Sequence, residues 1–327
     1  MQKKIKSYYR WFGLGVSLIA LAYFLNSALK QISTFPSLCW GLNAYASFAA
    51  ATSLNALVTL TGGYSWILLL RASGETLVTS EGLVIFALAQ FAKYIPGNVA
   101  HHAGRVALAS SRGLTLSRVI FTMILEAGWL IAAAAILAMA WLLFMRENLF
   151  KYMQDMPTVF QLAVAAALAI AFPLLVGWVL LKWRPGPLGK ILGDATVNTP
   201  SPGVLLNCLM LYLLCFLFMG IASDLLVRSL FGVKESRIFL LTGTFAVAWV
   251  AGFLTPGAPA GLGVREAILL KVLGPIYGAG VAVGLAISLR AITTLADVLT
   301  FTAALIANAT MNSSQREPLP PHLKKRF

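Results

Sequence analysis

Residues that could bind an anion inside a membrane occur twice in this chain, at the same spacing. Pro96-Gly97 is followed by Arg105, and 160 residues further on Pro256-Gly257 is followed by Arg265. Each copy lies between apolar stretches, where proline, glycine and charge are costly and usually functional. Such elements in corresponding places of two halves predict the substrate site of a transporter.

The predicted chemistry is recognition of phosphate or a phosphodiester. A helix that begins after each Pro-Gly break would present unpaired N–H groups and a positive dipole end, and a nearby arginine adds a guanidinium fork. The predicted substrate-binding residues fall into the two motif segments: Lys93, Pro96, Gly97, Asn98, His101, His102, Arg105, Pro256, Gly257, Gly261, Gly263, Arg265 and Glu266.

Several of these charges also have a structural interpretation. Lys93 and Arg105 could instead reach the cytoplasmic interface and anchor their segment there. The matching position of Arg265 favours a functional role for Arg105. Glu266 could form a salt bridge with a basic residue of the first segment, or take up a proton.

Four further charges lie inside predicted membrane spans, namely Glu126, Asp224, Arg290 and Asp297. Arg290 and Asp297 are seven residues apart on one helical face, and could pair directly or through a neighbour. Glu126 has no basic residue within one turn, so it is the strongest candidate for proton coupling, with Glu266 and Asp297 as the others. Structural pairing between helices is the alternative for all four.

Composition predicts an all-α, polytopic membrane protein. The chain is 59% hydrophobic and 11% charged, with a mean hydropathy of +0.82, and its long apolar runs lack the alternation of strands. The net charge of +14 does not indicate nucleic acid, because the basic residues lie at the ends of apolar runs. No nucleotide loop, CxxC site, nucleophile–base pattern or metal motif occurs, so we expect neither an enzyme nor a cofactor.

The apolar runs predict one transmembrane domain over residues 1–311 and a disordered basic cytoplasmic tail over 312–327. Six full spans are expected, at 11–30, 43–70, 117–145, 159–181, 203–231 and 278–308. Two re-entrant helical hairpins are expected between them, at 82–95 with 98–111 and at 240–255 with 259–273. Irregular backbone at membrane depth is tolerated where it lines a cavity or is buried in protein.

The same offset of 160 residues relates two halves, about 1–150 and 159–310. Three spans in each half place the second half in the opposite orientation, which is an inverted repeat. Basic residues are more numerous in the predicted cytoplasmic segments, such as Lys3, Lys4, Lys6 and Arg10 at the start of the chain. The positive-inside rule therefore predicts that both termini are cytoplasmic.

The two motifs resemble the signature stretches of the lysylphosphatidylglycerol synthase transmembrane, or flippase-like, family. The resemblance rests on residues 93–98 with Arg105 and on residues 256–266, which end Gly-Leu-Gly-Val-Arg-Glu, and it covers nearly the whole chain. Residues 256–261 read Pro-Gly-Ala-Pro-Ala-Gly, where the family more often runs Pro-Gly-Gly-Leu-Gly directly. The resemblance implies a multi-pass protein of the bacterial inner membrane that moves lipids between leaflets, without the aminoacyl-transfer domain of the synthases.

Two functions follow as hypotheses. The first is a flippase for an anionic, phosphate-bearing lipid, either a phospholipid or an isoprenoid-phosphate-linked lipid, clasped by Arg105, Arg265 and the helix ends. The second is a non-transporting membrane partner of a lipid-modifying enzyme such as a glycosyltransferase. An intramembrane enzyme that uses Glu126, Glu266 and His101 is the weakest alternative, because no nucleophile or metal site accompanies them.

Overall fold

The computed structural model describes residues 38–94, 100–144, 198–255 and 259–314, together with Asn26 and Leu29. Throughout these ranges the secondary structure is helical and no strand occurs. The elements in chain order are α2 (Leu42–Ala72), α3 (Thr79–Gln90), the 3-10 helix η2 (Phe91–Tyr94), α4 (Ala100–Ser111), α5 (Leu116–Phe144), α9 (Pro202–Phe231), α10 (Ile238–Leu254), the 3-10 helix η3 (Pro259–Gly261), α11 (Val264–Tyr277) and α12 (Ala279–Ser314).

Four helices are long and apolar enough to cross a membrane. They are Leu42–Ala72, Leu116–Trp141, Pro202–Phe231 and Ala279–Met311, and they match four of the six predicted spans. The chain is therefore a helical membrane protein, as predicted, and its described residues contain helices without strands. The other two predicted spans, 11–30 and 159–181, lie outside the described residues except for Asn26 and Leu29. Helix α12 continues to Ser314, into the segment predicted to be a disordered tail.

Local sequence explains where α9 begins and ends. The Ser201 hydroxyl accepts a hydrogen bond from the Val204 N–H at 3.5 Å, and Pro202 occupies the first helical position, where its missing N–H is not needed. Gly232 ends the helix in the left-handed region, with a φ of 66° that costs glycine little. Within α2, the hydroxyl groups of Thr52 and Ser65 donate hydrogen bonds to backbone carbonyls one turn earlier in the helix.

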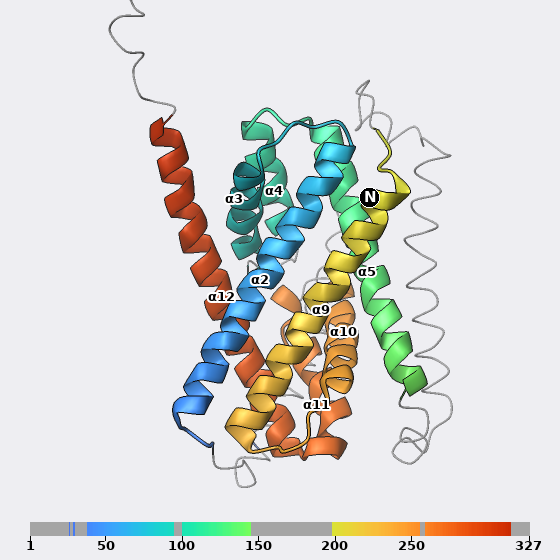
Figure 1. Cartoon of the computed structure of the whole chain (residues 1–327), viewed down its shortest axis with the longest axis vertical. Coiled ribbons are helices and arrows are strands. Elements are labelled where there is room, and N and C mark those ends of the chain that lie inside the picture. Colours follow the sequence, from blue (N-terminus) through green and yellow to red (C-terminus); the bar gives the residue numbers. More distant parts are fainter. Residues whose placement is uncertain are drawn as a thin grey trace, which may run out of the picture.

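Two pairs of shorter helices lie at opposite ends of the bundle (Figure 1). The first helix pair consists of α3, η2 and α4, and the second helix pair consists of α10, η3 and α11. Helices α3 and α4 have 12 residues each, about 18 Å of helix, which is shorter than the roughly 30 Å hydrocarbon core of a bilayer. Each pair begins and ends at the same end of the molecule, because short loops join it to neighbouring long helices.

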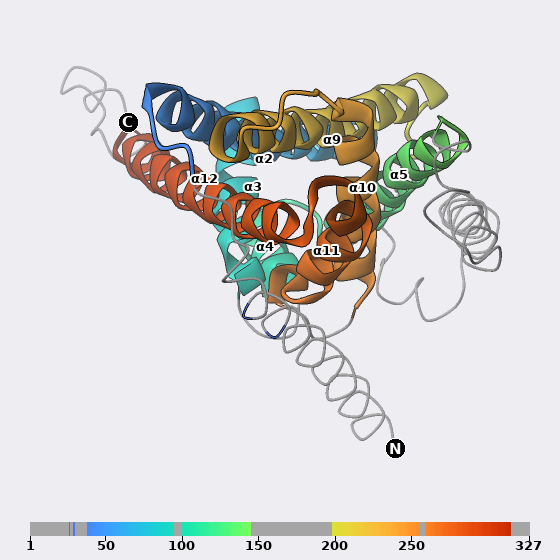
Figure 2. The same cartoon turned by 90° about the horizontal axis from the view of Figure 1, so that it is seen from below.

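The breaks of the two pairs meet inside the bundle. The 3-10 helices η2 and η3 contact each other, and α12 contacts α3, η2 and α11. Helices α2 and α9 pack together along one side of this junction, as the view from below also shows (Figure 2). The central junction is thus built from segments that are far apart in sequence.

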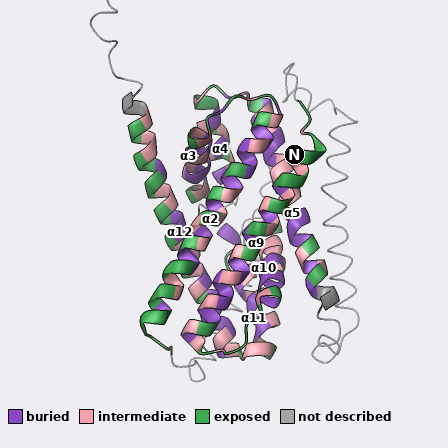
Figure 3. Ribbon diagram, in the orientation of Figure 1, coloured by how far each residue is buried: buried purple, intermediate pink, exposed green. Residues whose placement is uncertain are grey.

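Buried apolar side chains form two clusters, one associated with each helix pair. One cluster includes Trp66, Ile85 and Phe86 beside the first pair, and the other includes Leu241 and Leu273 beside the second. The outward faces of the long helices remain exposed (Figure 3). Many of these exposed side chains are large and apolar, for example Leu206, Leu214, Leu299 and Ile306. Exposed apolar surface on this scale suits a lipid environment.

Close packing between α9 and α10 depends on Gly220. A Cβ atom at this position would lie 1.8 Å from the Thr242 hydroxyl oxygen and 3.1 Å from the Thr242 Cα, so the backbone of α10 would have to move. We expect Gly220→Ala to lower the free energy of unfolding by about 1–3 kcal/mol through overpacking.

Gly203 provides the matched control in the same helix, because nothing lies within 4 Å of a Cβ added there. Unfolding in mixed detergent micelles, followed by circular dichroism, measures both variants. Gly203→Ala is expected to be as stable as the wild type or slightly more so. Equal stability of the two variants would show that α9 and α10 are not packed this closely.

Candidate functional site

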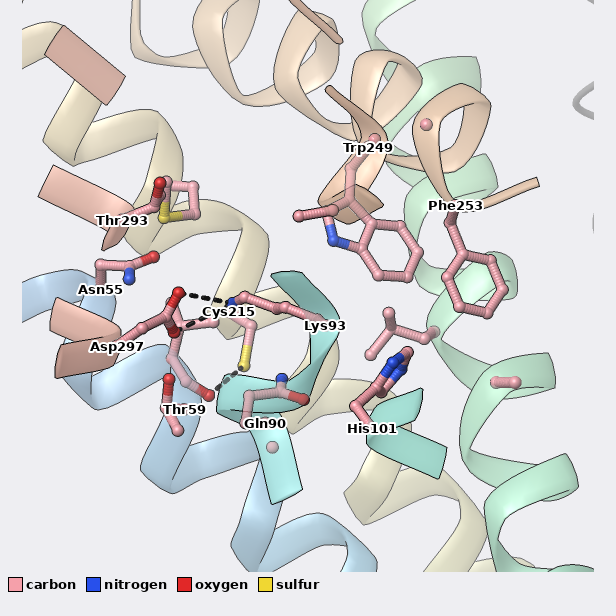
Figure 4. A pocket seen from close by; sticks show the side chains of 18 of the residues that line it. Asn55, Thr59, Gln90, Lys93, His101, Cys215, Trp249, Phe253, Thr293 and Asp297 are labelled. Atoms are coloured by element: carbon pink, nitrogen blue, oxygen red, sulfur yellow. Dashed lines mark hydrogen bonds and ion pairs between the residues drawn. The ribbon is translucent and has the colours of Figure 1, made fainter. Parts of the chain in front are cut away.

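A cavity of about 190 Å³ lies where the two helix pairs meet. This central cavity is lined by residues of α2, α3, η2, α4, α5, α9, α10, η3, α11 and α12. A buried water needs only about 10–15 Å³ of such space, so the cavity has room for a polar ligand group. Figure 4 shows part of its lining, with Lys93 reaching towards Asp297.

The structure describes eight of the thirteen predicted substrate-binding residues and places six of these eight in the cavity lining. The residues of the predicted site that line the central cavity are Lys93, His101, His102, Arg105, Gly261 and Arg265, and the predicted intramembrane charges that also line it are Glu126, Arg290 and Asp297. Gly263 and Glu266 adjoin the cavity without lining it. Pro96, Gly97, Asn98, Pro256 and Gly257 lie outside the described residues.

Lys93 forms an ion pair with Asp297 of α12. Its Nζ lies 2.7 Å from Oδ2 and donates to Oδ1 at 2.9 Å, while the Tyr94 hydroxyl donates to Oδ2 at 2.5 Å. The Asp297 side chain is only 2% exposed. Lys93 therefore reaches towards α12 inside the bundle in this conformation.

Arg105 is almost completely buried and pairs with Glu126 of α5. Its guanidinium carbon lies 4.2 Å from the centre of the Phe86 ring and 5.2 Å from the Trp66 ring, so aromatic faces enclose the charge. The guanidinium of Arg105 is thus enclosed within the bundle. Glu126 has no base nearby in sequence, but tertiary structure supplies one from α4.

Glu266 pairs with Arg290 of α12. Its Oε1 lies 2.6 Å from one terminal nitrogen of Arg290 and accepts from Nε at 3.0 Å. Its Oε2 accepts a hydrogen bond from the Gly263 N–H at 2.7 Å, which caps the start of α11. The basic partner of Glu266 in this structure thus comes from α12 and not from the first segment.

Arg290 and Asp297 do not pair with each other directly. Arg290 holds the second helix pair through Glu266, and Asp297 holds the first through Lys93. Residues on one face of α12 therefore form ion pairs with both helix pairs, close to the point where each pair is broken. Asp224 lies elsewhere, near the end of α9, where it accepts a hydrogen bond from the Arg237 N–H at 3.1 Å.

Arg265 is the exception among the cations of the cavity. No carboxylate of the described residues lies within ion-pair distance of it, and its buried Nε has no hydrogen-bond partner. Its stem lies between Gly252 and Gly261, where an added Cβ would come within 2.8 Å of Arg265 atoms. The arginine stem is therefore confined between two glycines, and no carboxylate of the described residues pairs with its charge.

Among the described residues, the charges that line the cavity, counted together with the Glu266 partner of Arg290, leave one positive charge in excess. Lys93, Arg105 and Arg290 each have a carboxylate partner, whereas Arg265 has none among the residues described. Burial of an unpaired charge in a low-dielectric interior is costly. The arrangement therefore favours binding of a group with one negative charge beside Arg265.

Sequence reasoning missed several residues of the cavity. Trp249 and Phe253 of α10 have rings stacked at 5.0 Å with an angle of 10° between their planes, and the Arg265 guanidinium lies 5.8 Å from the Trp249 ring. Asn55 and Gln90 also line the cavity. The sequence signal was weak, because an aromatic in an apolar run looks the same whether it faces lipid or a cavity.

Comparison of the chain with protein-family models and with curated proteins finds no match to either.

Proposed function

We propose that this protein moves a lipid with an anionic, phosphate-bearing headgroup, a phospholipid or an isoprenoid-phosphate-linked lipid, from one leaflet of the membrane to the other. The observation that carries the proposal is Arg265, whose guanidinium faces the central cavity without a carboxylate partner among the described residues. A phosphodiester carries one negative charge and accepts two parallel hydrogen bonds from a guanidinium. It would neutralise the charge excess of the cavity.

The proposed architecture is an inverted repeat with two re-entrant helix pairs. Helices α2 and α9 run in opposite directions, as do α5 and α12, and the two helix pairs occupy opposite ends of the bundle (Figure 1). This arrangement supports re-entry of the first pair from one face of the membrane and of the second from the other. The breaks would then lie near the midplane, where such transporters bind substrate.

The ion pairs suggest how the site could change its access. Lys93–Asp297 holds the first helix pair to α12, and Glu266–Arg290 holds the second. An anionic headgroup that enters the cavity competes with these carboxylates for the cations around it. Release of one pair at a time would open the cavity towards one membrane face, while the lipid tail stays in the bilayer.

We further propose that both termini lie in the cytoplasm and that the protein resides in a bacterial inner membrane. The distribution of basic residues supports cytoplasmic termini, and the resemblance to the flippase-like family supports a bacterial inner membrane. With this orientation, the first helix pair would enter from the cytoplasmic face and the second from the outer face.

Lipid translocation in proteoliposomes tests the function. We expect the wild-type protein, with or without a proton gradient, to move a fluorescent phosphatidylglycerol or a polyprenyl phosphate much faster than a labelled phosphatidylcholine of the same chain length. Empty liposomes provide the background rate. Well-folded protein that moves no lipid under any condition would contradict the proposal and favour a membrane partner of a lipid-modifying enzyme.

A further inference from the structure

The central cavity has two chemically different walls. Asn55 and Thr59 of α2, together with Gln90 of α3, form a polar wall, and Trp249 and Phe253 of α10 form an aromatic wall. Figure 4 shows the two aromatic side chains on one side of the pocket and Asn55 and Thr59 on the other. None of the ion pairs of the cavity involves Asn55, Thr59 or Gln90.

The polar wall offers hydrogen-bonding groups that the protein does not use. Asn55 is 7% exposed and Thr59 is 6% exposed, and neither side chain, nor that of Gln90, forms a hydrogen bond with any residue in the described part of the chain. In the same helix, Thr52 donates to the Phe48 carbonyl at 2.8 Å. Because these three side chains line the cavity and form no hydrogen bond within the described protein, a ligand in the cavity can pair with them.

The chemistry of the polar wall indicates what this partner is. Amide and hydroxyl side chains are uncharged, and each can both donate and accept a hydrogen bond. Hydroxyl groups match that combination, whereas a phosphate oxygen matches only the donors. The aromatic wall opposite presents ring surface, which accommodates the C–H faces of a polyol or a sugar.

We infer that the cavity recognises a headgroup that bears hydroxyl groups beside its phosphate, with the hydroxyls bound by Asn55, Thr59 and Gln90 and the phosphate by Arg265. This inference rests on the proposed function and narrows its substrate class. The hydroxyls can belong to glycerol in a phosphodiester lipid or to a sugar linked through phosphate to a lipid. Both kinds of headgroup carry hydroxyl groups close to a phosphate, which is the combination that the two walls and Arg265 would bind.

Binding of matched lipid probes to the full-length protein in detergent tests the inference. The probes are phosphatidylglycerol, phosphatidylmethanol, which has the same charge but no free hydroxyl, and a polyprenyl-phosphoglucose. We expect the wild type to bind the better of the two hydroxyl-bearing probes about tenfold more tightly than phosphatidylmethanol, as one or two neutral hydrogen bonds would provide. If phosphatidylglycerol binds more tightly than polyprenyl-phosphoglucose, the recognised hydroxyls belong to glycerol. If polyprenyl-phosphoglucose binds more tightly, they belong to a sugar.

Thr59→Val, alone and combined with Asn55→Leu, removes the polar groups while nearly keeping their volume. We expect these variants to lose most of the tenfold preference by weakening only the hydroxyl-bearing probes. Thr52→Val is the matched control, because Thr52 lies on the same helix but does not line the cavity, and it should keep the preference. If the Asn55→Leu/Thr59→Val variant fails to fold, Thr59→Val alone still tests the inference.

Absence of a preference in the wild type, or equal weakening of all probes by Thr59→Val, would overturn the inference. The proposed function fails in a different way. If Arg265→Gln leaves the affinity for every anionic probe unchanged, the anion site is wrong whatever the hydroxyl preference. If Arg265→Gln weakens all probes and no hydroxyl preference exists, the anion site stands and only this inference fails.

Discussion

Replacement of Arg265 by glutamine is expected to weaken the binding of an anionic lipid about 100-fold while the protein remains folded. A hydrogen-bonded pair that involves charge contributes about 1.5–3 kcal/mol, and its loss corresponds to this change in affinity. Stability is spared because no carboxylate among the described residues depends on Arg265. The glutamine side chain is shorter than that of arginine, so it adds no bulk between Gly252 and Gly261.

Titration of the purified protein with phosphatidylglycerol, together with its unfolding in detergent, measures both parts of this expectation. Arg228→Gln is the matched control, because Arg228 is 52% exposed at the end of α9 and lies outside the central cavity. Arg265→Lys should recover part of the affinity, since it restores the charge without the planar fork. Unaltered affinity in Arg265→Gln would remove Arg265 from the site.

Replacement of Arg105 by methionine is expected to destabilise the fold by about 3–5 kcal/mol, whereas Arg265→Gln is expected to spare stability. Destabilisation of this size is the usual effect of removing one partner of a buried ion pair. Arg105 is 2% exposed, and its loss would leave the Glu126 carboxylate uncompensated and remove the cation from between Phe86 and Trp66.

The companion variant Arg105→Met/Glu126→Leu separates this explanation from simple loss of packing. A buried ion pair that is replaced by apolar side chains of similar size is often neutral in stability. We therefore expect the double variant to recover most of the free energy of unfolding lost in Arg105→Met. If both variants were equally unstable, the ion pair would not be the cause.

The contrast between Arg105 and Arg265 could not be predicted from their matching positions in sequence. Both arginines line the central cavity, but the shared spacing alone left open whether the two segments meet. Their partners, however, come from other helices. Glu126 lies in α5, 21 residues from Arg105, and only the packing of α4 on α5 brings the two together.

The long helices were the part of the fold that the sequence predicted well. The hydrophobic runs at 43–70 and 203–231 match α2 and α9 within a residue or two, because length and apolarity determine whether a helix can span a bilayer. The role of α12 was not predictable. Its Arg290 and Asp297 lie on one face and suggested mutual pairing, but each reaches the break of a different helix pair.

The two walls of the cavity illustrate a second limit of sequence patterns. Trp249 and Phe253 lie in an apolar helix in which almost any side chain satisfies the hydropathy pattern. Asn55 and Thr59 likewise resemble ordinary polar residues of a helix that return hydrogen bonds to their own backbone. Their orientation towards the cavity depends on the rotation of α2 and α10 in the bundle, which is set by tertiary packing.

Translocation of a labelled anionic lipid in proteoliposomes that contain wild type, Arg265→Gln or Arg228→Gln tests the central claim most directly. We expect the wild type and Arg228→Gln to move the lipid at similar rates and Arg265→Gln to be slower by about 100-fold, in proportion to the lost headgroup contact. Movement of the lipid by Arg265→Gln at the wild-type rate would contradict the claim that the headgroup binds between the two helix pairs.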